Sequence, residues 1–163
     1  MVSKGSYAES QVQAMCELYR LNQLAAISKK ETPMVFGKGA PRRGKTTGFD
    51  FEGTGPDGRS VCVEVKETAK PSLAILQPGH KGSGLQWEQV QELKFRQALG
   101  AEAMIMWLHW VDAIGGDWHI IDPSEITAGQ KSIRIDHDLF RECPIYQGLP
   151  DFLGLCGTIS KRR

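Results

Sequence analysis

The stretch TTGFDFEGTGPDGRSVCVEVKE, residues 46–67, carries the clearest structural signal in the chain. Two runs rich in β-branched and aromatic residues, 46–52 and 60–67, flank the hexapeptide GTGPDG at residues 53–58. Glycine, proline and aspartate packed this densely favour a turn, because they readily adopt the backbone angles that turns require. We therefore predict a β-hairpin built from these two runs.

The second strand of this hairpin alternates apolar and polar side chains. Successive side chains of a strand point to opposite faces, so the odd-numbered valines should face the core, whereas the other face carries Cys62, Glu64 and Lys66. Glu64 and Lys66 should thus project side by side. Asp50 is 14 residues away from Glu64 in the sequence, but it lies on the partner strand and should come close to Glu64 in space.

Two carboxylates beside an ammonium suit the metal-dependent hydrolysis of a phosphodiester. Mg²⁺ prefers oxygen ligands, commonly one or two carboxylates with waters, and a cation offsets the negative charge by which phosphate repels a hydroxide. We therefore predict Asp50 and Glu64 as metal ligands, with Lys66 within reach of water or phosphate. The residues alone leave an alternative open, an exposed cross-strand ion pair, because E-x-K is frequent by chance and such pairs are common on hairpins.

The remaining segments predict a sheet flanked by helices. Ser6 and Glu9 form a capping-box pattern that should begin a helix running to about Ile27, and a second helix should begin near Leu85 and end before Gly100. Strands are expected at residues 32–36, 101–111 and 118–121, and loops at residues 37–44 and 69–84. We predict an α/β (α+β) fold with a central mixed β-sheet, in one domain spanning residues 1–163.

Composition restricts the class of protein. With 40% hydrophobic and 24% charged residues, the 163-residue chain has the composition of an ordinary soluble globular protein. No apolar run reaches the roughly 20 residues that cross a membrane, and no secretory pattern opens the chain, so we expect a cytoplasmic protein without a membrane partner. The four cysteines are widely spaced, which favours buried free thiols over a zinc site.

Basic residues concentrate in one segment and at the C-terminus. Residues 28–47 hold six Lys or Arg against one acidic residue, and the basic tail, residues 158–163, ends in three more. This layout favours one face made for an anionic partner, with a solvated loop and tail as the alternative. In the basic loop, residues 37–45, we expect Arg42, Arg43 and Lys45 to contact DNA phosphates.

Residues 39–46, GAPRRGKT, also match the P-loop pattern of nucleotide-binding proteins. A P-loop needs a helix after it, because the first amides of that helix hold the phosphate. Here a strand-like run and the turn at residues 53–58 follow, where no helix forms. We therefore expect no nucleotide cofactor.

Asp50, the turn and Glu64-Val65-Lys66 together resemble the PD-(D/E)XK nuclease motif. The wider chain is similar to the RecU-type Holliday-junction resolvases over about two-thirds of its length. Four segments carry this resemblance: SKKETP at residues 28–33, TTGFDFEG at 46–53, VEVKET at 63–68, and a helix led by Gln86 with the apolar strand after it. Two departures stand out, since Gly48-Phe49 replaces the family's threonine before the aspartate and the family's projecting stalk is reduced to residues 37–45.

The resemblance implies a restriction-endonuclease-like core and a homodimer that cuts two opposed strands of four-way junction DNA with Mg²⁺, for which Mn²⁺ is expected to substitute. Two matched cuts on a two-fold junction also suit two related active sites. The implied metal ligands are Asp50, Glu64 and the Val65 carbonyl. Lys66 would position water or stabilise the transition state.

Glu9 and Gln86 each have two interpretations. Glu9 resembles the first-helix glutamate that archaeal-type resolvases place near the metal, but it also completes the capping box with Ser6. Gln86 completes a capping box with Ser83, whereas the resemblance places a glutamine near the active site, as a DNA contact. Lys29 and Lys30, in the SKKETP segment, are further expected DNA-binding residues.

The sequence as a whole predicts a structure-selective, Mg²⁺-dependent endodeoxyribonuclease that resolves Holliday junctions in DNA recombination and repair. Two alternatives stay open. One is a PD-(D/E)XK nuclease acting on another DNA structure or duplex site, and the other is a non-catalytic DNA-binding recombination factor.

Overall fold

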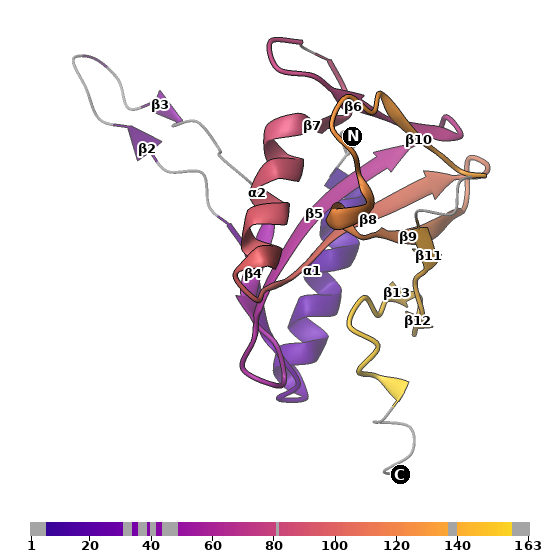
Figure 1. Cartoon of the computed structure of the whole chain (residues 1–163). Helices are drawn as coiled ribbons and strands as arrows, with labels where there is room; N and C mark the ends of the chain where they lie inside the picture. Colours follow the sequence, from indigo (N-terminus) through magenta and orange to yellow (C-terminus); the bar gives the residue numbers. More distant parts are fainter. Residues whose placement is uncertain are drawn as a thin grey trace.

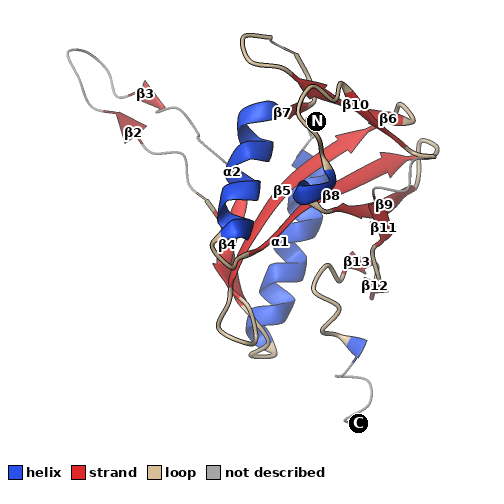
Figure 2. Ribbon diagram, viewed as in Figure 1, coloured by secondary structure: helices blue, strands red, loops and turns tan. Residues whose placement is uncertain are grey.

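The structure is a computed structural model that describes residues 6–30, 34–35, 39, 42–43, 49–80, 82–136 and 140–157. Its centre is a six-stranded sheet with the order β1-β4-β5-β8-β9-β11 (Figure 2). The strands are β1 (Ala26–Lys29), β4 (Phe51–Thr54), β5 (Ser60–Thr68), β8 (Glu102–Trp110), β9 (Gly116–Ile121) and β11 (Phe140–Glu142). All neighbours pair antiparallel except β5 and β8, which are parallel, so the sheet is mixed as predicted.

One helix covers each face of this sheet (Figure 1). α1 (Ser6–Leu21) buries Ala8, Val12, Met15 and Tyr19, whose spacing of three or four residues places them on one side of a helix. They pack with the valines of β5 in one core cluster. α2 (Trp87–Ala98) buries Val90 and Leu93 against the other face, in a second cluster that includes Cys62 and Trp107. The predicted fold class, a mixed sheet flanked by helices, is confirmed.

The predicted hairpin of residues 46–52 and 60–67 is present in the part that the structure describes. β4 pairs with β5 in the register Phe51↔Val63, and the turn between them includes Gly58 at φ 82°. Such a left-handed angle is readily available only to glycine. Residues 46–48 of the predicted first strand lie outside the described residues.

The segment 69–84, predicted as a loop, contains a strand. β6 (Ser72–Leu76) pairs with β10 (Ser132–Arg134) on one side and with β7 (Leu85–Gln86) on the other, as a separate three-stranded sheet. Leu73 and Ile75 alternate with more exposed neighbours and are buried in the core cluster beneath α2. The prediction was wrong because the partner strand β10 lies far along the chain, in a segment whose sequence gave no clear pattern.

Both helices also differ in length from the predictions. The first helix ends at Leu21 and not at about Ile27, because Gln23 adopts φ 56°, and Ile27 belongs to β1, where it is buried. The second begins at Trp87, since Leu85 and Gln86 pair with β6. The predicted strands at 101–111 and 118–121 correspond to β8 and β9.

The C-terminal segment folds back onto α1. After the 3-10 helix η1 (Pro123–Glu125) and β11, the short strands β12 (Ile145–Tyr146) and β13 (Leu149–Pro150) lead to Asp151, which is buried. The Asp151 carboxylate accepts hydrogen bonds from the Tyr19 hydroxyl at 2.5 Å and from the amides of Leu155 and Cys156 at 3.1 and 3.0 Å. All four cysteines are free and buried, as predicted.

The basic loop is described only in part. β2 (Met34–Val35) pairs antiparallel with β3 (Arg42–Arg43), and both strands lie apart from the central sheet (Figure 1). The side chains of Arg42 and Arg43, together with Lys45, Gly48 and the tail at residues 158–163, lie outside what the structure describes. The predictions for them therefore stay predictions.

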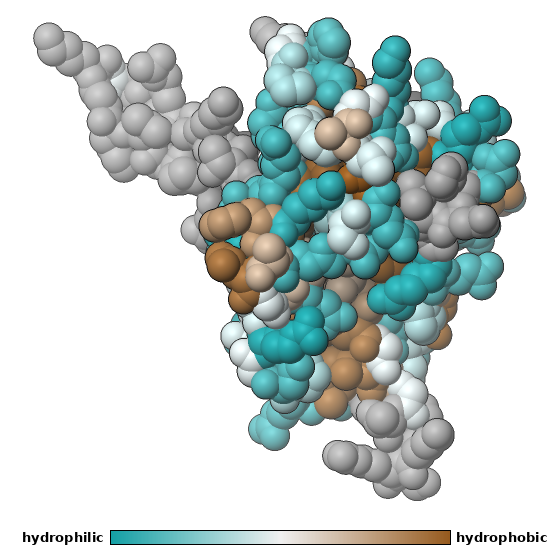
Figure 3. Space-filling view, viewed as in Figure 1, coloured by the Kyte–Doolittle hydropathy of each residue, from teal (hydrophilic) through white to brown (hydrophobic). Residues whose placement is uncertain are grey.

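The surface around α2 is mostly polar. One apolar patch interrupts it near the C-terminal end of the helix, where Phe95 and Leu99 are 58% and 71% exposed (Figure 3). Among the described residues, no helix is both long and apolar enough to span a membrane.

Candidate active site

Asp50 and Glu64 come together because β4 begins one residue after Asp50. The Asp50 amide donates to the Val63 carbonyl at 3.1 Å, which extends the ladder of β4 and β5 by one bond. The Asp50 carboxylate then accepts the amide of Val65 at 2.9 Å, at the point where β5 has lost its backbone partner on that side. Asp50 is thereby fixed beside Glu64, in agreement with the predicted hairpin.

Glu64 is a charged residue in an almost dry environment, with only 1% of its surface exposed. Its Oε1 atom lies 3.1 Å from the Lys66 ammonium and accepts a hydrogen bond of 3.1 Å from the Gln89 side-chain amide. Its Oε2 atom is buried and accepts no hydrogen bond from the residues that the structure describes. A buried carboxylate oxygen without a partner is costly, so the site is incomplete without a further positive group.

The electrostatics of the pair point the same way. Burial raises the pKa of Glu64 to about 8; the nearby Asp50 charge and a side-chain hydrogen bond between the two carboxyl groups add to this rise, which Lys66 only partly opposes. Burial also raises the pKa of Asp50, against the hydrogen bond from the Val65 amide. With both groups ionised, the pair would hold more negative charge than its surroundings neutralise, and a bound cation would favour that ionised form.

The donor set fits a hard divalent cation. Within the described ranges, no three His, Cys, Asp or Glu side chains form a group that could hold a metal ion. Mg²⁺ does not require three such side chains, because it is usually held by one or two carboxylates and keeps several waters. Asp50 and the free Oε2 of Glu64 meet that requirement.

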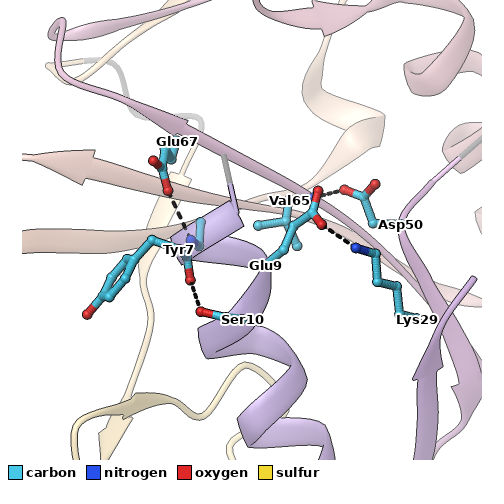
Figure 4. A network of polar contacts seen from close by, with 8 residues as sticks. Tyr7, Glu9, Ser10, Lys29, Asp50, Val65 and Glu67 are labelled. Carbon is cyan, nitrogen blue, oxygen red and sulfur yellow. Dashed lines mark hydrogen bonds and ion pairs between the residues drawn. The ribbon is translucent and has the colours of Figure 1, made fainter. Parts of the chain in front are cut away.

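Glu9 lies near this pair of carboxylates and is ion-paired to a lysine. Glu9 lies on the first turn of α1, and its carboxylate forms an ion pair of 2.7 Å with Lys29 on β1 (Figure 4). Its charge still reaches Asp50, whose pKa it helps to raise. Lys29, predicted to contact DNA, is thus paired within the protein, and the role of Glu9 as a metal ligand stays a prediction.

Beside the carboxylates opens a cleft of about 810 Å³. It lies between the first turns of the two helices and the end of β5, and its lining includes Glu9, Val65, Lys66, Gln86 and Gln89. Gln86 lies in the lining of the cleft but makes no contact with Glu64 that the structure describes, and its role as a DNA contact stays a prediction. A second hollow, of about 540 Å³, contains none of the predicted site residues.

The predicted faces of β5 are confirmed, with one difference. Cys62 and Glu64 do share the face opposite the valines, but α2 covers that face, so both are buried. Lys66 retains 23% exposure of its side chain. Lys30, another predicted DNA contact, places its ammonium 4.4 Å from the centre of the Phe49 ring.

Sequence reasoning missed Gln89, the neutral side chain that contacts Glu64. The Gln89 side-chain oxygen also accepts the Gln86 amide at 3.0 Å, at the start of α2. The available signal was the position of Gln89 three residues after Gln86, the spacing of a capping partner. That signal identifies a helix start, but it does not reveal that the amide also reaches β5.

No family model and no curated protein sequence matches the chain. Among solved structures, the chain is similar to Hjc, a Holliday junction resolvase from the archaeal hyperthermophile Archaeoglobus fulgidus. The similarity covers 80% of this chain and 88% of that chain, at 20% identity and a TM-score of 0.47. So distant a likeness assigns no activity, and the functional proposal rests on the site itself.

Proposed function

We propose that this protein is a Mg²⁺-dependent endodeoxyribonuclease that cuts four-way DNA junctions, and that Asp50, Glu64 and Lys66 form its active site. The observation that carries the proposal is the buried carboxyl pair of Glu64 and Asp50, in which Glu64 Oε2 accepts no hydrogen bond from an amide or ammonium of the described residues, next to an ammonium that lines an open cleft. A cross-strand ion pair alone does not account for this arrangement, because it would not need a second carboxylate in a dry site.

Asp50 and Glu64 would hold the cation, and the Val65 carbonyl would complete the protein ligands. The amide of Val65 points to Asp50, and the amide and carbonyl of one strand residue point to the same side. When bound, Mg²⁺ supplies Lewis-acid activation of the phosphate and of the attacking water. Mn²⁺ should substitute, because it accepts the same oxygen ligands.

Lys66 would act on the charge that develops at phosphorus. Its ammonium is held 3.1 Å from Glu64 Oε1 and lines the cleft, so it can donate a hydrogen bond to the attacking water or to a phosphate oxygen. In the reaction, the water oxygen forms a bond to phosphorus and the bond to the 3′ oxygen breaks, which leaves a 5′-phosphate. This polarity follows from the resemblance to the PD-(D/E)XK nucleases.

The choice of substrate rests on the resemblance to RecU-type resolvases. We propose a homodimer with one restriction-endonuclease-like nuclease domain per chain, acting in the cytoplasm in DNA recombination and repair. A two-fold dimer presents two equivalent sites, which matches the two opposed cuts that resolve a junction. Lys29, Lys30, Arg42, Arg43, Lys45 and Gln86 are the proposed DNA contacts, without a nucleotide cofactor.

Cleavage of labelled DNA tests this function. The unaltered chain should cut a synthetic four-way junction in the presence of Mg²⁺ and stop cutting in EDTA. Asp50→Ala should abolish cutting and leave junction binding intact, because the basic residues that contact phosphate are unchanged. The matched control is Asp57→Ala, at an exposed position in the turn between β4 and β5, which should cut normally.

Three outcomes would revise the proposal. Equal cutting of linear duplex and junction would replace the resolvase by a nuclease with another substrate. Cutting that survives Asp50→Ala would refute the assigned site. Binding without any cutting by the unaltered chain would favour a non-catalytic DNA-binding factor.

A further inference from the structure

The side-chain amide of Gln89 is held at both ends. Its Nε2 donates to Glu64 Oε1 at 3.1 Å, and its Oε1 accepts the backbone amide of Gln86 at 3.0 Å. The backbone N–H of Gln86 is a donor, so the Gln89 atom that it contacts must be the side-chain oxygen, Oε1. The nitrogen end of Gln89 is therefore directed at Glu64, and a flipped amide would lose both bonds.

The contacts to Glu64 are unevenly shared between its two oxygens. Gln89 and the Lys66 ammonium both approach Oε1, each at 3.1 Å. Oε2, in contrast, is buried and accepts no hydrogen bond within the described part of the chain. Two donors on one oxygen fix the rotation of the carboxylate, because turning it would break both contacts. The lone pairs of Oε2 are thereby left for another group.

We propose that Gln89 is a positioning residue that holds Glu64 Oε1 so that Oε2 is presented to the metal ion shared with Asp50. This role rests on the proposed function, since it requires a metal at Asp50 and Glu64. Side chains that orient metal ligands in this way typically change metal affinity by about 10- to 100-fold when they are replaced. The competing explanation is that Gln89 only satisfies a buried carboxylate and joins α2 to the sheet.

The test compares two glutamines of the same helix. Gln89→Met keeps the length of the side chain but removes both hydrogen bonds. Gln91→Met makes the same chemical change at an exposed position of α2. Mg²⁺ binding to the full chain without DNA is measured by titration calorimetry. We expect Gln89→Met to weaken Mg²⁺ binding by about 10-fold or more, and Gln91→Met to bind like the unaltered chain.

Cleavage supplies a second readout. For Gln89→Met, the Mg²⁺ concentration that gives half-maximal cutting should rise by the same factor as the dissociation constant. The rate at saturating Mg²⁺ should change little, because the ligand is still present and excess metal restores its occupancy. A merely structural contact would lower the amount of folded protein without moving the Mg²⁺ dependence.

The free energy of unfolding of each variant, measured in EDTA, shows whether it is folded without metal. Gln89→Asn is a milder second variant. It keeps the amide but withdraws it from Glu64 by one methylene, so it should also weaken Mg²⁺ binding. Unaltered Mg²⁺ affinity in both folded variants would overturn the positioning role, as would a failure of both to fold. Asp50→Ala separates the two proposals. If this variant binds Mg²⁺ normally, the proposed metal site is wrong. If Asp50→Ala loses Mg²⁺ binding while both Gln89 variants keep it, only the positioning role of Gln89 is wrong.

Discussion

At the scale of single residues, the site is governed by the cost of burying charge. Glu64 is almost completely buried and has Lys66 as its only ion-pair partner among the described residues. The Asp50 carboxylate adds a second negative charge nearby, so burial and repulsion together raise the pKa of Glu64 to about 8. A structural ion pair would be more stable without the second acid, and the arrangement is explained by a cation that both acids bind.

This charge predicts a pH dependence of stability for the metal-free chain. The pKa of Glu64 is raised in the folded state, from 4.5 to about 8, so folding favours the protonated form. In EDTA, the contribution of Glu64 to the free energy of unfolding should be greatest below about pH 4.5 and fall as the pH rises towards 8, by at most about 1.4 kcal/mol per pH unit. Glu64→Gln cannot titrate, so it should lack this part of the decline.

Urea unfolding of the two proteins across this pH range measures the effect. Saturating Mg²⁺ should reduce the decline in the unaltered chain, because the ion stabilises the charged form of Glu64. If the free energy of unfolding in EDTA depended on pH in the same way for Glu64→Gln and the unaltered chain, the charge of Glu64 would not destabilise the folded state.

At the scale of secondary structure elements, β5 organises both the core and the site. Its valines pack under α1, while the other face carries Cys62 and Glu64 under α2. Because β4 begins only at Phe51, the Val65 amide has no strand partner on that side and donates to the Asp50 carboxylate. One strand thus fixes the positions of the two helices and of both acids.

The contact between α1 and the C-terminal segment gives a prediction at this scale. The Tyr19 hydroxyl donates to Asp151 at 2.5 Å and accepts the Leu153 amide at 3.0 Å, so it joins the helix to the chain after β13. Tyr19→Phe leaves two buried polar groups without this partner and should lower the free energy of unfolding by about 1–3 kcal/mol. Thermal or urea unfolding measures the change.

Tyr7→Phe is the matched control, because Tyr7 lies on the same helix and is 43% exposed. It should unfold like the unaltered chain. If Tyr19→Phe and Tyr7→Phe were equally stable, the hydroxyl of Tyr19 would not hold the C-terminal segment in solution.

The elements also explain which features could be predicted from sequence. The hairpin and its two acids were accessible because turn residues and alternation are local signals, and the faces of β5 followed from them. β6 was missed because its pairing with β10 is set by residues about 60 positions apart. Gln89 was missed because its contact with Glu64 depends on how α2 lies over β5, which no local pattern specifies.

At the scale of the whole molecule, the cleft lies where both helices begin. α1 and α2 cover opposite faces of the sheet and start towards the same end of it (Figure 1), and Glu9 and Gln89 line the cleft from their first turns. The N-terminal end of a helix carries partial positive charge. Two such ends beside Lys66 favour the approach of a phosphate backbone to Asp50 and Glu64.

The basic loop should contribute a separate part of DNA affinity. Replacing Arg42 and Arg43 by alanine should weaken junction binding, and the slope of log K against log salt should flatten by roughly one unit for each lost phosphate contact. Replacing Arg59 and Arg134, which are exposed on the body of the protein, removes the same charge and should leave the slope nearly unchanged. An unaltered slope for the Arg42 and Arg43 variant would show that the loop does not contact DNA.

The most direct test of the account locates the metal. Crystals of the full chain soaked in Mn²⁺ would reveal the ion by its anomalous scattering. We predict a peak within bonding distance of the Asp50 carboxylate and of Glu64 Oε2, and its loss in Asp50→Ala. Mn²⁺ bound elsewhere, with Asp50 and Glu64 facing each other and no ion between them, would contradict the proposed active site.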